Sequence, residues 1–351
     1  MSPDAFREQA IRAIDAVADY MRRVESLPAR PRTKPGDVLK HIPEHASETP
    51  GDAHEWTRIF DDLERIVVPN MTHWQSPNFF GYFPCNSTGP AIIGELLSAG
   101  FGQQGMLWAT SPAASELERA LLDQMGRAMG LPESFLSASE TGGGCIQSTA
   151  SDATLAAMVA GRRRVSDQGA DFHKTTVYAS SQTHSSFIKA ALITGLASTV
   201  TDTSRVRTIE TDDQLRMDPA KLEAAIREDI ARGLTPAMVC ATLGTTGTTA
   251  IDPLADIARV LRDTDPGEVF DYRDWGVPLG RRFRALKLWF VLRHYGLEGL
   301  RAHVRQGLAQ AELFESLVRA DDRFVVLTPR TMNLVCIALR AGEDATRQLM
   351  D

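Results

Sequence analysis

Cysteines, aromatic residues and long hydrophobic runs are all scarce in this chain. Four cysteines are scattered over 351 residues without a CxxC pair, so their spacing indicates neither a disulfide framework nor a cysteine metal site. No stretch approaches the roughly eighteen uninterrupted apolar residues of a membrane span. Residues 1–21 carry charges where a secretory signal would be apolar. We therefore expect a reduced protein in the cytoplasm, with no membrane partner.

An excess of positive charge is missing as well. The chain has 38 basic and 45 acidic side chains, which gives a formal net charge of -7. Nucleic acids bind proteins largely through positive charge that releases counterions, so we expect no nucleic-acid partner. The hydrophobic share of 43% and the length suit a globular protein with one large and one smaller domain.

The N-terminal part has a helical pattern. Ser2, Pro3 and Asp4 are typical of a helix start, and the apolar residues from Phe6 to Val24 recur every three or four positions. This spacing predicts an amphipathic helix whose apolar stripe needs a partner surface. A linker rich in proline and charge follows, and a second helix is predicted around 54–67.

From about Ser111 onward, apolar strand patterns alternate with helix patterns. This alternation predicts an α/β fold with a mostly parallel, doubly wound sheet. The predicted helices cover 112–129, 151–164, 185–195, 219–232 and 253–263, and the predicted strands cover 175–181, 206–210 and 237–245.

The alternation stops after the helix at 253–263. Another buried strand is expected there, but the segment PGEVFDYRDWGVPLG (266–280) is polar and loop-like. The sheet is therefore expected to be incomplete near Val260 and Leu261, and a small α+β domain is expected at the C-terminus. Its predicted elements are helices at 280–295 and 297–320, strands at 323–328 and 334–340, and the beginning of a further helix.

A glycine-rich turn at 142–144 precedes a predicted helix that begins with hydroxyl side chains. Ser148, Thr149 and Ser151 lie where the free N–H groups and the partial positive charge of a helix N-terminus favour a phosphate. The segment matches neither a Walker A motif nor a GxGxxG fingerprint. An ordinary turn with a Ser/Thr cap explains the same residues, so both interpretations stay open.

Two further polar segments follow predicted strand ends. SQTHSS places His184 just after one strand, and ATLGTTGT places Thr245 after another. Open α/β sheets bind ligands at the carboxyl ends of their strands, where a histidine can stack on a flat ring or transfer a proton. A capping histidine and a threonine-rich turn are the alternatives. The two segments and the glycine-rich turn are predicted to share one edge of the sheet.

Two other patterns are weaker. HIPEH (41–45) fits a zinc motif that requires a continuous helix, and Pro43 breaks such a helix, so we expect no metal. Arg281, Arg284 and Lys287 form a basic stripe at helical spacing. It is either a phosphate contact or a solvated or interdomain helix face, and the acidic net charge favours the second.

Together these residues resemble the aromatic-L-amino-acid decarboxylase group of pyridoxal-phosphate enzymes, which has the fold type I transferase-like architecture. The motifs run in the family's order over nearly the whole chain. They are HWQSPNFFGYFP (73–84), GMLWATSPAASELE (105–118), GGGCIQSTASDATL (142–155), SSQTHSSFIKA (180–190), ATLGTTGTTAID (241–252) and DYRDWGVPLGRRFRALKLWF (271–290).

The resemblance implies roles for individual residues. Thr149, Ala150 and Ser151 would hold the phosphate of pyridoxal 5'-phosphate, His184 would stack on its ring, and Thr245 would lie beside the ring. The first helix would pack against the other protomer of a homodimer. The residues implied on the substrate side are Tyr82, Phe83, Pro84 and Cys85, together with Leu279 and Gly280, which would reach into the neighbouring subunit's site.

Two groups of the family pattern do not occur in the sequence. The family has an Asp-Ala-Ala strand end, whose acid faces the pyridine nitrogen, and an Asn-Pro-His-Lys-Trp segment, whose lysine forms the Schiff base. Both belong between Asp252 and Asp271, which only eighteen residues separate here. We therefore expect an internal deletion near 260–261, a C-terminal truncation and impaired, non-covalent cofactor binding. The six lysines are Lys34, Lys40, Lys174, Lys189, Lys221 and Lys287.

The implied function is decarboxylation of an L-amino acid, expected to be aromatic, to an amine and carbon dioxide, with this chain inactive. A non-catalytic relative that binds a ligand or partner, and a truncated gene product, stay open. Another lyase or a transaminase of fold type I is the runner-up chemistry. The expected domains are a helical segment for dimer packing at 1–85, a cofactor-binding α/β domain at 86–270, and a truncated C-terminal region at 271–351.

Overall fold

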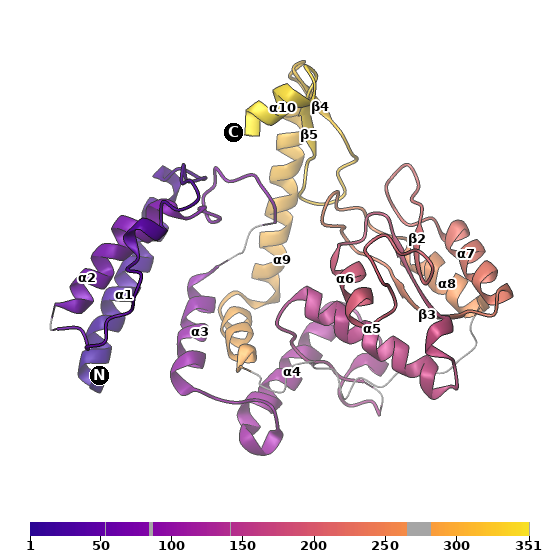
Figure 1. Cartoon of the computed structure of the whole chain (residues 1–351), viewed down its shortest axis with the longest axis horizontal. Helices are drawn as coiled ribbons and strands as arrows, with labels where there is room; N and C mark the ends of the chain where they lie inside the picture. Colours follow the sequence, from indigo (N-terminus) through magenta and orange to yellow (C-terminus); the bar gives the residue numbers. More distant parts are fainter. Residues whose placement is uncertain (53, 84–86, 141, 265–281, 351) are drawn as a thin grey trace. The chain divides into compact units, whose positions relative to one another are not determined.

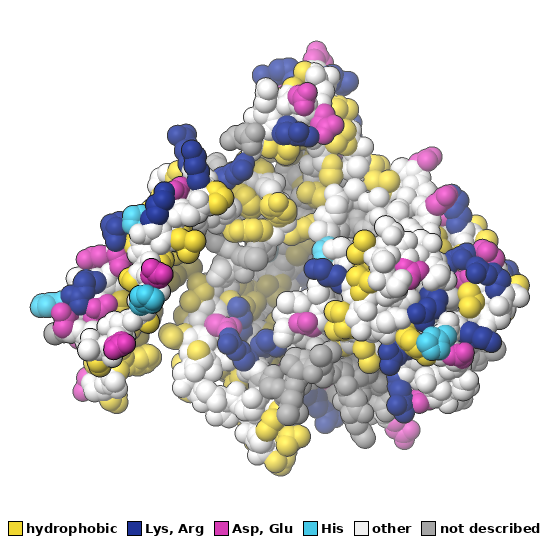
Figure 2. All heavy atoms as spheres, viewed as in Figure 1, with side chains coloured by type: hydrophobic (Ala, Val, Ile, Leu, Met, Phe, Trp, Pro, Cys, Tyr) yellow, Lys and Arg dark blue, Asp and Glu magenta, His cyan; other side chains and the backbone are white. Residues whose placement is uncertain are grey.

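The computed structural model describes residues 1–52, 54–83, 87–140, 142–264 and 282–350. The chain forms two compact units, Met1–Thr88 and Gly89–Asp351. No helix in the described stretches is both long and apolar enough to cross a membrane. Side chains of both charge signs are interspersed over the visible surface (Figure 2), in keeping with the near balance of acidic and basic residues.

The first unit begins with the predicted amphipathic helix, α1 (Pro3–Arg23). The Ser2 hydroxyl accepts the N–H of Ala5 at 3.1 Å, which caps the first turn, and Pro3 occupies a position that needs no N–H donor. The apolar stripe of this helix is exposed in the single chain, at Phe6, Ile11, Ile14, Val17 and Met21.

The rest of the first unit consists of short helical pieces around one buried histidine. The predicted helix at 54–67 forms as α2 (Glu55–Asp62), which continues into a π-helical turn. The buried ring of His73 accepts or donates a 3.0 Å hydrogen bond at Nδ1 with the hydroxyl of Tyr20 on α1. The short pieces are η1 (Val24–Ser26), η2 (Leu39–His41), η3 (Leu63–Val67) and η4 (Val68–Asn70).

A three-stranded parallel sheet forms the centre of the second unit. Its strand order is β2-β1-β3, with β1 (Thr175–Ser180) between β2 (Val206–Ile209) and β3 (Thr235–Cys240). All six residues of β1 are buried, whereas all six of β3 are half-exposed. Among the described residues, β3 therefore has a strand neighbour on one side only.

Helices cover both faces of this sheet (Figure 1). Val177 and Ala179 of β1 point into a core formed with α5 (Ala150–Asp167) and α6 (Ser186–Ile193). The alternate residue Tyr178 points to the opposite face, where Ile226 and Ile257 lie in its core. The helices of that face are α7 (Pro219–Ala231) and α8 (Leu254–Thr264). This arrangement confirms the predicted parallel, doubly wound α/β class.

A third core cluster lies between α4 (Pro112–Ala128) and the start of α9 (Arg284–Arg319). The sequence predicted two helices in the α9 region. The structure confirms two helical stretches within α9, because Gly296, with φ 62° and ψ 173°, interrupts the helical backbone between them. The further pieces are η5 (Trp108–Thr110), η6 (Glu133–Phe135) and η7 (Phe172–Lys174).

Helix α3 (Gly89–Phe101) was missed by the sequence analysis. It packs closely on α9, and a Cβ added to Gly94 would come within 2.8 Å of the Lys287 Cα. The helix is apolar on average, so it lacks the polar face that would mark a helical period.

The C-terminal region contains a small antiparallel pair and a last helix, as predicted. These elements are β4 (Phe324–Val326), β5 (Ile337–Leu339) and α10 (Glu343–Met350). The predicted loop at 266–280 lies outside the described residues.

The predicted strand at 237–245 was wrong at both ends. The strand starts at Thr235, before Pro236, and ends at Cys240. Beyond it the chain turns back on itself, because the Asp252 carboxylate accepts the N–H of Thr242 at 2.8 Å and the two backbones pair. A local pattern of apolar residues does not contain this long-range contact.

Candidate functional site

The three polar segments singled out by the sequence lie at one edge of the sheet. His184 follows the carboxyl end of β1, and Thr245 follows the carboxyl end of β3, which is the parallel neighbour of β1. Helix α5 leads into β1 through a short connection, and its last turns lie beside the start of β3. Its N-terminus, at Thr149, therefore extends toward the carboxyl edge. Ligands of open α/β sheets bind at this edge.

The N-terminus of α5 has the features of an anion site. Thr149 is the N-cap, and its hydroxyl accepts the N–H of Asp152 at 3.1 Å. This bond leaves the N–H groups of Ala150 and Ser151 at the helix start without an intrahelical acceptor. Ala150 and Ser151 are both exposed, so a ligand can reach them. The arrangement fits a phosphate through the helix dipole and the first-turn donors.

A cation lies beside the same loop. The Arg284 guanidinium, at the start of α9, donates a 3.1 Å hydrogen bond to the Ser148 hydroxyl. The sequence analysis considered Arg284 only as part of a basic stripe and favoured a solvated or interdomain helix face. In the structure Arg284 contacts the loop directly before α5, and the role of the stripe stays a prediction.

The glycine-rich turn is held tightly against the preceding segment. A Cβ on Gly142 would come within 2.2 Å of the Leu136 carbonyl oxygen, so only glycine fits there. Gly143 has φ 137°, a backbone conformation that favours glycine. The loop is further fixed at Ile146, whose N–H donates to Glu118 at 2.9 Å. The turn therefore approaches α5 in a defined conformation.

The ring of His184 is exposed and oriented by its neighbour. Its Nδ1 accepts the backbone N–H of Ser186 at 3.2 Å and lies 3.0 Å from the Ser186 hydroxyl. Because a backbone N–H can only donate, Nδ1 is the acceptor and the proton of the neutral ring resides on Nε2. An exposed, oriented imidazole at a strand end can stack on a flat ligand.

The hydroxyl of Thr245 is buried and already engaged. It accepts the N–H of Ala250 at 3.1 Å and pairs with the Thr248 hydroxyl at 2.8 Å. These bonds fix the turn after β3.

Burial raises the pKa of the Cys240 thiol at the end of β3, and the nearby Asp252 carboxylate raises that pKa further.

Two of the predicted substrate-side residues, Tyr82 and Phe83, lie in the described part of the first unit. Tyr82 is 84% exposed, and its ring stacks on Trp74 with centroids 5.7 Å apart. Tyr82 also has a positive φ of 57°. The residues that lie outside the described stretches are Pro84, Cys85, Leu279 and Gly280.

The lysines of the second unit precede β1, are exposed on α6 or are in ion pairs. Lys174 precedes β1 and so lies at the amino end of the sheet, opposite His184. Lys189 is exposed on α6, one turn beyond His184. Ion pairs hold three others: Lys40 with Asp37, Lys221 with Glu210, and Lys287 with Glu95 at 3.6 Å.

One structural residue at this edge escaped the sequence analysis. The buried Asp252 carboxylate accepts the N–H of Met217 at 2.7 Å and that of Thr242 at 2.8 Å. It joins the loop after β2 to the loop after β3. Its partners are 35 and 10 residues away, and both donors are backbone groups, so no side-chain motif marks the contact.

Comparisons with known proteins agree on one family. A family model described as "Pyridoxal-dependent decarboxylase conserved domain" matches residues 35–267 and 260–340. Tryptophan decarboxylase 2 of Oryza sativa subsp. japonica is 34% identical, with 97% of this chain and 82% of the relative covered. Tyrosine decarboxylase 4 of Petroselinum crispum is 35% identical, with coverages of 97% and 80%.

The fold comparison agrees. The crystal structure of Oryza sativa TDC with PLP superposes with a TM-score of 0.90 at 33% identity and covers all of this chain and 88% of that one.

The alignments also contain positions that this chain does not fill. The rice alignment spans 415 positions, and 97% of 351 residues supplies only about 340 of them, so about 75 positions have no counterpart here. The two matched stretches of the family model meet at 260–267, at the end of α8.

Proposed function

Because this chain belongs to the pyridoxal-dependent decarboxylase family, whose members are carboxy-lyases, we propose that it is a derivative of an aromatic amino-acid decarboxylase with little or no activity of its own. Its site keeps the groups that bind the phosphate and the ring of pyridoxal phosphate. It has lost the lysine that carries the aldehyde and the acid that faces the pyridine nitrogen. The observation that carries the proposal is the alignment, in which about 75 positions of the rice relative have no counterpart in this chain and the two stretches matched by the family model meet at 260–267.

The phosphate side of the site fits the cofactor. Thr149, Ala150 and Ser151 would hold the phosphate at the start of α5, with Arg284 nearby as an added positive charge. His184 would stack on the ring of the cofactor. Thr245, whose hydroxyl is hydrogen-bonded within the turn after β3, would lie beside that ring. When bound, pyridoxal phosphate supplies an electron sink for loss of carbon dioxide.

The covalent side does not fit. Lys189 is the lysine nearest to His184 in sequence, yet it is exposed on α6, one turn beyond that ring. Lys221 is in an ion pair with Glu210, which keeps its amine charged and non-nucleophilic, and contact with Glu210 raises its pKa further. We therefore derive no covalent step, and cofactor binding is proposed to be non-covalent and weakened.

The substrate class is inferred from the relatives and from the exposed aromatic residues of the first unit. The relatives named tryptophan decarboxylase and tyrosine decarboxylase each align with 97% of this chain. We therefore propose an aromatic L-amino acid as the ligand of the family site. Tyr82 and Phe83 would supply apolar contact to it. For Pro84, Cys85, Leu279 and Gly280, which lie outside the described residues, we propose the roles that the resemblance implies. We further propose a cytoplasmic homodimer that packs through the exposed stripe of α1.

A second function, non-catalytic binding of a phosphorylated ligand, is favoured by one contact. The Arg284–Ser148 hydrogen bond maintains a cation beside the α5 N-terminus without any contribution from a lysine. Phosphate affinity can therefore persist after catalysis is lost.

Reductive trapping tests the proposal. The purified chain is incubated with one equivalent of pyridoxal phosphate, treated with borohydride and weighed by mass spectrometry, beside rice tryptophan decarboxylase 2 as the positive control. We expect the rice protein to gain one reduced cofactor and this chain to keep its mass. Equilibrium dialysis before reduction should still detect non-covalent binding. One cofactor trapped on a single lysine of this chain would contradict the proposal.

A further inference from the structure

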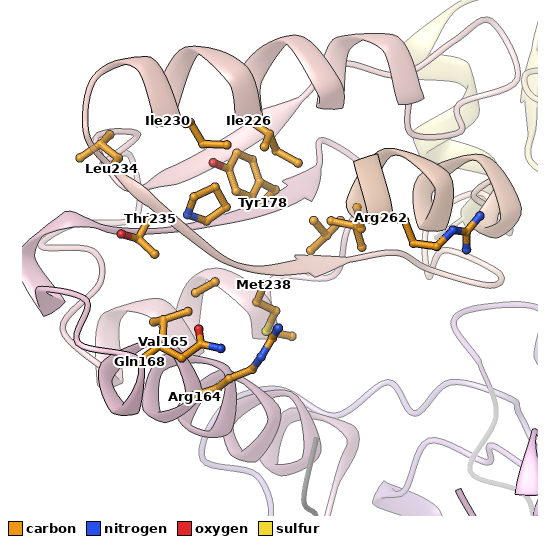
Figure 3. A pocket seen from close by; sticks show the side chains of 14 residues that line it. Arg164, Val165, Gln168, Tyr178, Ile226, Ile230, Leu234, Thr235, Met238 and Arg262 are labelled. Carbon is orange, nitrogen blue, oxygen red and sulfur yellow. The ribbon is translucent and has the colours of Figure 1, made fainter. Parts of the chain in front are cut away.

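Residues 243–251 form the turn that follows β3 and carries Thr245, here called the Thr245 turn. The strand before it is fixed by the helix layer, since Met238 points toward α5 and packs against the core on that face (Figure 3). Within the turn, the N–H groups of Gly244 and Thr245 donate to the Ala250 carbonyl oxygen at 3.1 and 3.0 Å. The turn therefore has a closed backbone of its own beyond the end of the strand.

Thr249 has an unfavourable backbone conformation in this turn. Its φ is 58°, and a β-branched residue rarely occupies this left-handed region. The residue is 1% exposed, and its N–H donates to the Thr245 carbonyl oxygen at 2.8 Å. Such a conformation persists only where the surrounding contacts hold it. A contact that holds Thr249 therefore also holds Thr245.

Thr331 of the C-terminal region makes such a contact. Its hydroxyl donates to the Thr249 carbonyl oxygen and lies 2.9 Å from the Thr249 hydroxyl, although the two residues are 82 positions apart. The Thr249 hydroxyl also has an acceptor in the Thr248 carbonyl oxygen, at 2.7 Å. Loss of the Thr331 hydroxyl would therefore remove the bond to the Thr249 carbonyl without leaving the buried Thr249 hydroxyl unsatisfied.

Two neighbours of Thr331 contact the same turn. A Cβ added to Gly244 would come within 2.9 Å of the Met332 Sδ, and the Cys336 thiol donates to the Gly247 carbonyl oxygen at 3.4 Å. The C-terminal segment therefore contacts the Thr245 turn before its tip, at its tip and, through Thr331, after it.

We propose that Thr331 is a positioning residue for the cofactor edge. Through Thr249 it holds the Thr245 turn in the conformation that places Thr245 beside the ring of pyridoxal phosphate. The C-terminal segment 331–336 thereby shapes a site whose other groups lie at the start of α5 and after β1. The identity of the ligand rests on the proposed function, whereas the hold on the turn is a property of the free chain.

Three variants of the full chain test this role. Thr331→Val removes the hydroxyl and keeps the shape of the side chain, and Thr331→Ser keeps the hydroxyl. Thr346→Val is the matched control, because the Thr346 hydroxyl accepts the N–H of Leu339 and donates to the Gly342 carbonyl oxygen, both at 2.9 Å, within the C-terminal region. Thr331 is exposed and Thr346 is half-exposed, so all three variants should fold.

The first measurement is hydrogen exchange of the amides at 244–250 in the free chain. We expect exchange about three- to tenfold faster in Thr331→Val, the size that loss of one hydrogen bond gives. Thr331→Ser and Thr346→Val should exchange at close to the wild-type rate, because both keep the bond to the Thr249 carbonyl.

The second measurement is the circular dichroism induced in bound 4'-deoxypyridoxine 5'-phosphate, a cofactor analogue without the aldehyde, which cannot react with surface lysines. The analogue is achiral, so its signal reports how the site orients the ring. Equilibrium dialysis gives the amount bound. We expect Thr331→Val to change the signal per bound analogue, and Thr331→Ser and Thr346→Val to keep it. A general loss of stability would lower the amount bound without changing this ratio.

Unchanged exchange at 244–250 in Thr331→Val, or the same acceleration in Thr346→Val, would overturn the proposal. An unchanged signal per bound analogue in Thr331→Val would also overturn it, because the turn would then not position the ring. Absence of analogue binding by the wild-type chain would contradict the proposed function, and the exchange rates would then decide the hold on the turn by themselves.

Discussion

Arg284 donates a 3.1 Å hydrogen bond to Ser148, and this contact places the start of α9 beside the loop that precedes α5. The two residues are 136 positions apart in the sequence. A positive charge is thereby fixed near the helix end that is proposed to hold the cofactor phosphate. This contact is one of the structural features from which we propose an affinity for phosphate.

Replacement of Arg284 by glutamine should weaken binding of pyridoxal phosphate and of inorganic phosphate by about three- to tenfold. A charged donor near an anion contributes about 1 kcal/mol at a partly exposed site. Equilibrium dialysis measures both ligands. Arg293→Gln, on the same helix but over the Trp289 ring, is the control and should bind normally. Equal loss in the two variants would assign the effect to general charge.

Gly142→Ala should damage the phosphate loop. The new methyl group would overlap the Leu136 carbonyl, whose oxygen is 2.2 Å from the Cβ position, so the loop must shift. We expect a loss of about 1–3 kcal/mol in the free energy of unfolding together with weaker cofactor binding. Gly247→Ala, where a Cβ meets nothing within 4 Å, is the matched variant and should retain both properties. Urea denaturation that gives the same midpoint for both would refute the clash.

Tyr178→Phe should destabilise the second unit. The Tyr178 hydroxyl donates at 2.8 Å to the Asp229 carboxylate, which is buried and also lies 3.3 Å from Arg207. Loss of one donor to a buried carboxylate costs about 1–3 kcal/mol. The same substitution at Tyr295, which is 39% exposed, is expected to be near neutral in urea denaturation. A neutral Tyr178→Phe would show that the Arg207 contact is sufficient.

Acid should weaken the C-terminal region through Glu315. Hydrogen bonds from Arg319 and Arg330 hold the pKa of Glu315 below its usual value. A carboxylate with a lowered folded-state pKa stabilises the fold above its unfolded pKa of about 4.3 and loses that contribution as pH falls through the folded value. Glu315→Gln should therefore lower the unfolding free energy at pH 7 by up to about 1 kcal/mol and flatten its fall below pH 4.3.

Glu312→Gln, on an exposed side of the same helix, is the control for this titration. Its unfolding free energy should follow the wild-type curve at every pH. If the unfolding free energy of Glu315→Gln falls as steeply as that of the wild type below pH 4.3, Glu315 does not contribute to the loss of stability in acid.

The sequence predicted the elements around the sheet well because their signals are local. Thr149 as a cap, the apolar run of β1 and the glycine break at Gly296 all appear within a few residues. The same locality allowed the prediction that His184 and Thr245 share one edge, since parallel strands end together. The resemblance to the decarboxylase group was likewise confirmed by the family match.

Other features depend on contacts that a local pattern does not contain. The end of β3 at Cys240 depends on Asp252, and the position of Arg284 depends on Ser148. Helix α3 is apolar on average and so shows no amphipathic period, and its packing on α9 is a contact between distant parts of the sequence. The roles of Tyr82, Leu279 and their neighbours stay predictions, since Tyr82 belongs to the first unit and Leu279 lies outside the described residues.

The most direct test of the central claim is carbon dioxide release from carboxyl-labelled L-tryptophan and L-tyrosine. The purified chain, saturated with pyridoxal phosphate, is compared with rice tryptophan decarboxylase 2 at equal protein concentration. The account predicts release indistinguishable from that of the free cofactor, because we propose that the chain has lost the lysine that carries the aldehyde. Turnover within about tenfold of the rice enzyme would contradict the account, since that rate requires both the lysine that carries the aldehyde and the acid that faces the pyridine nitrogen.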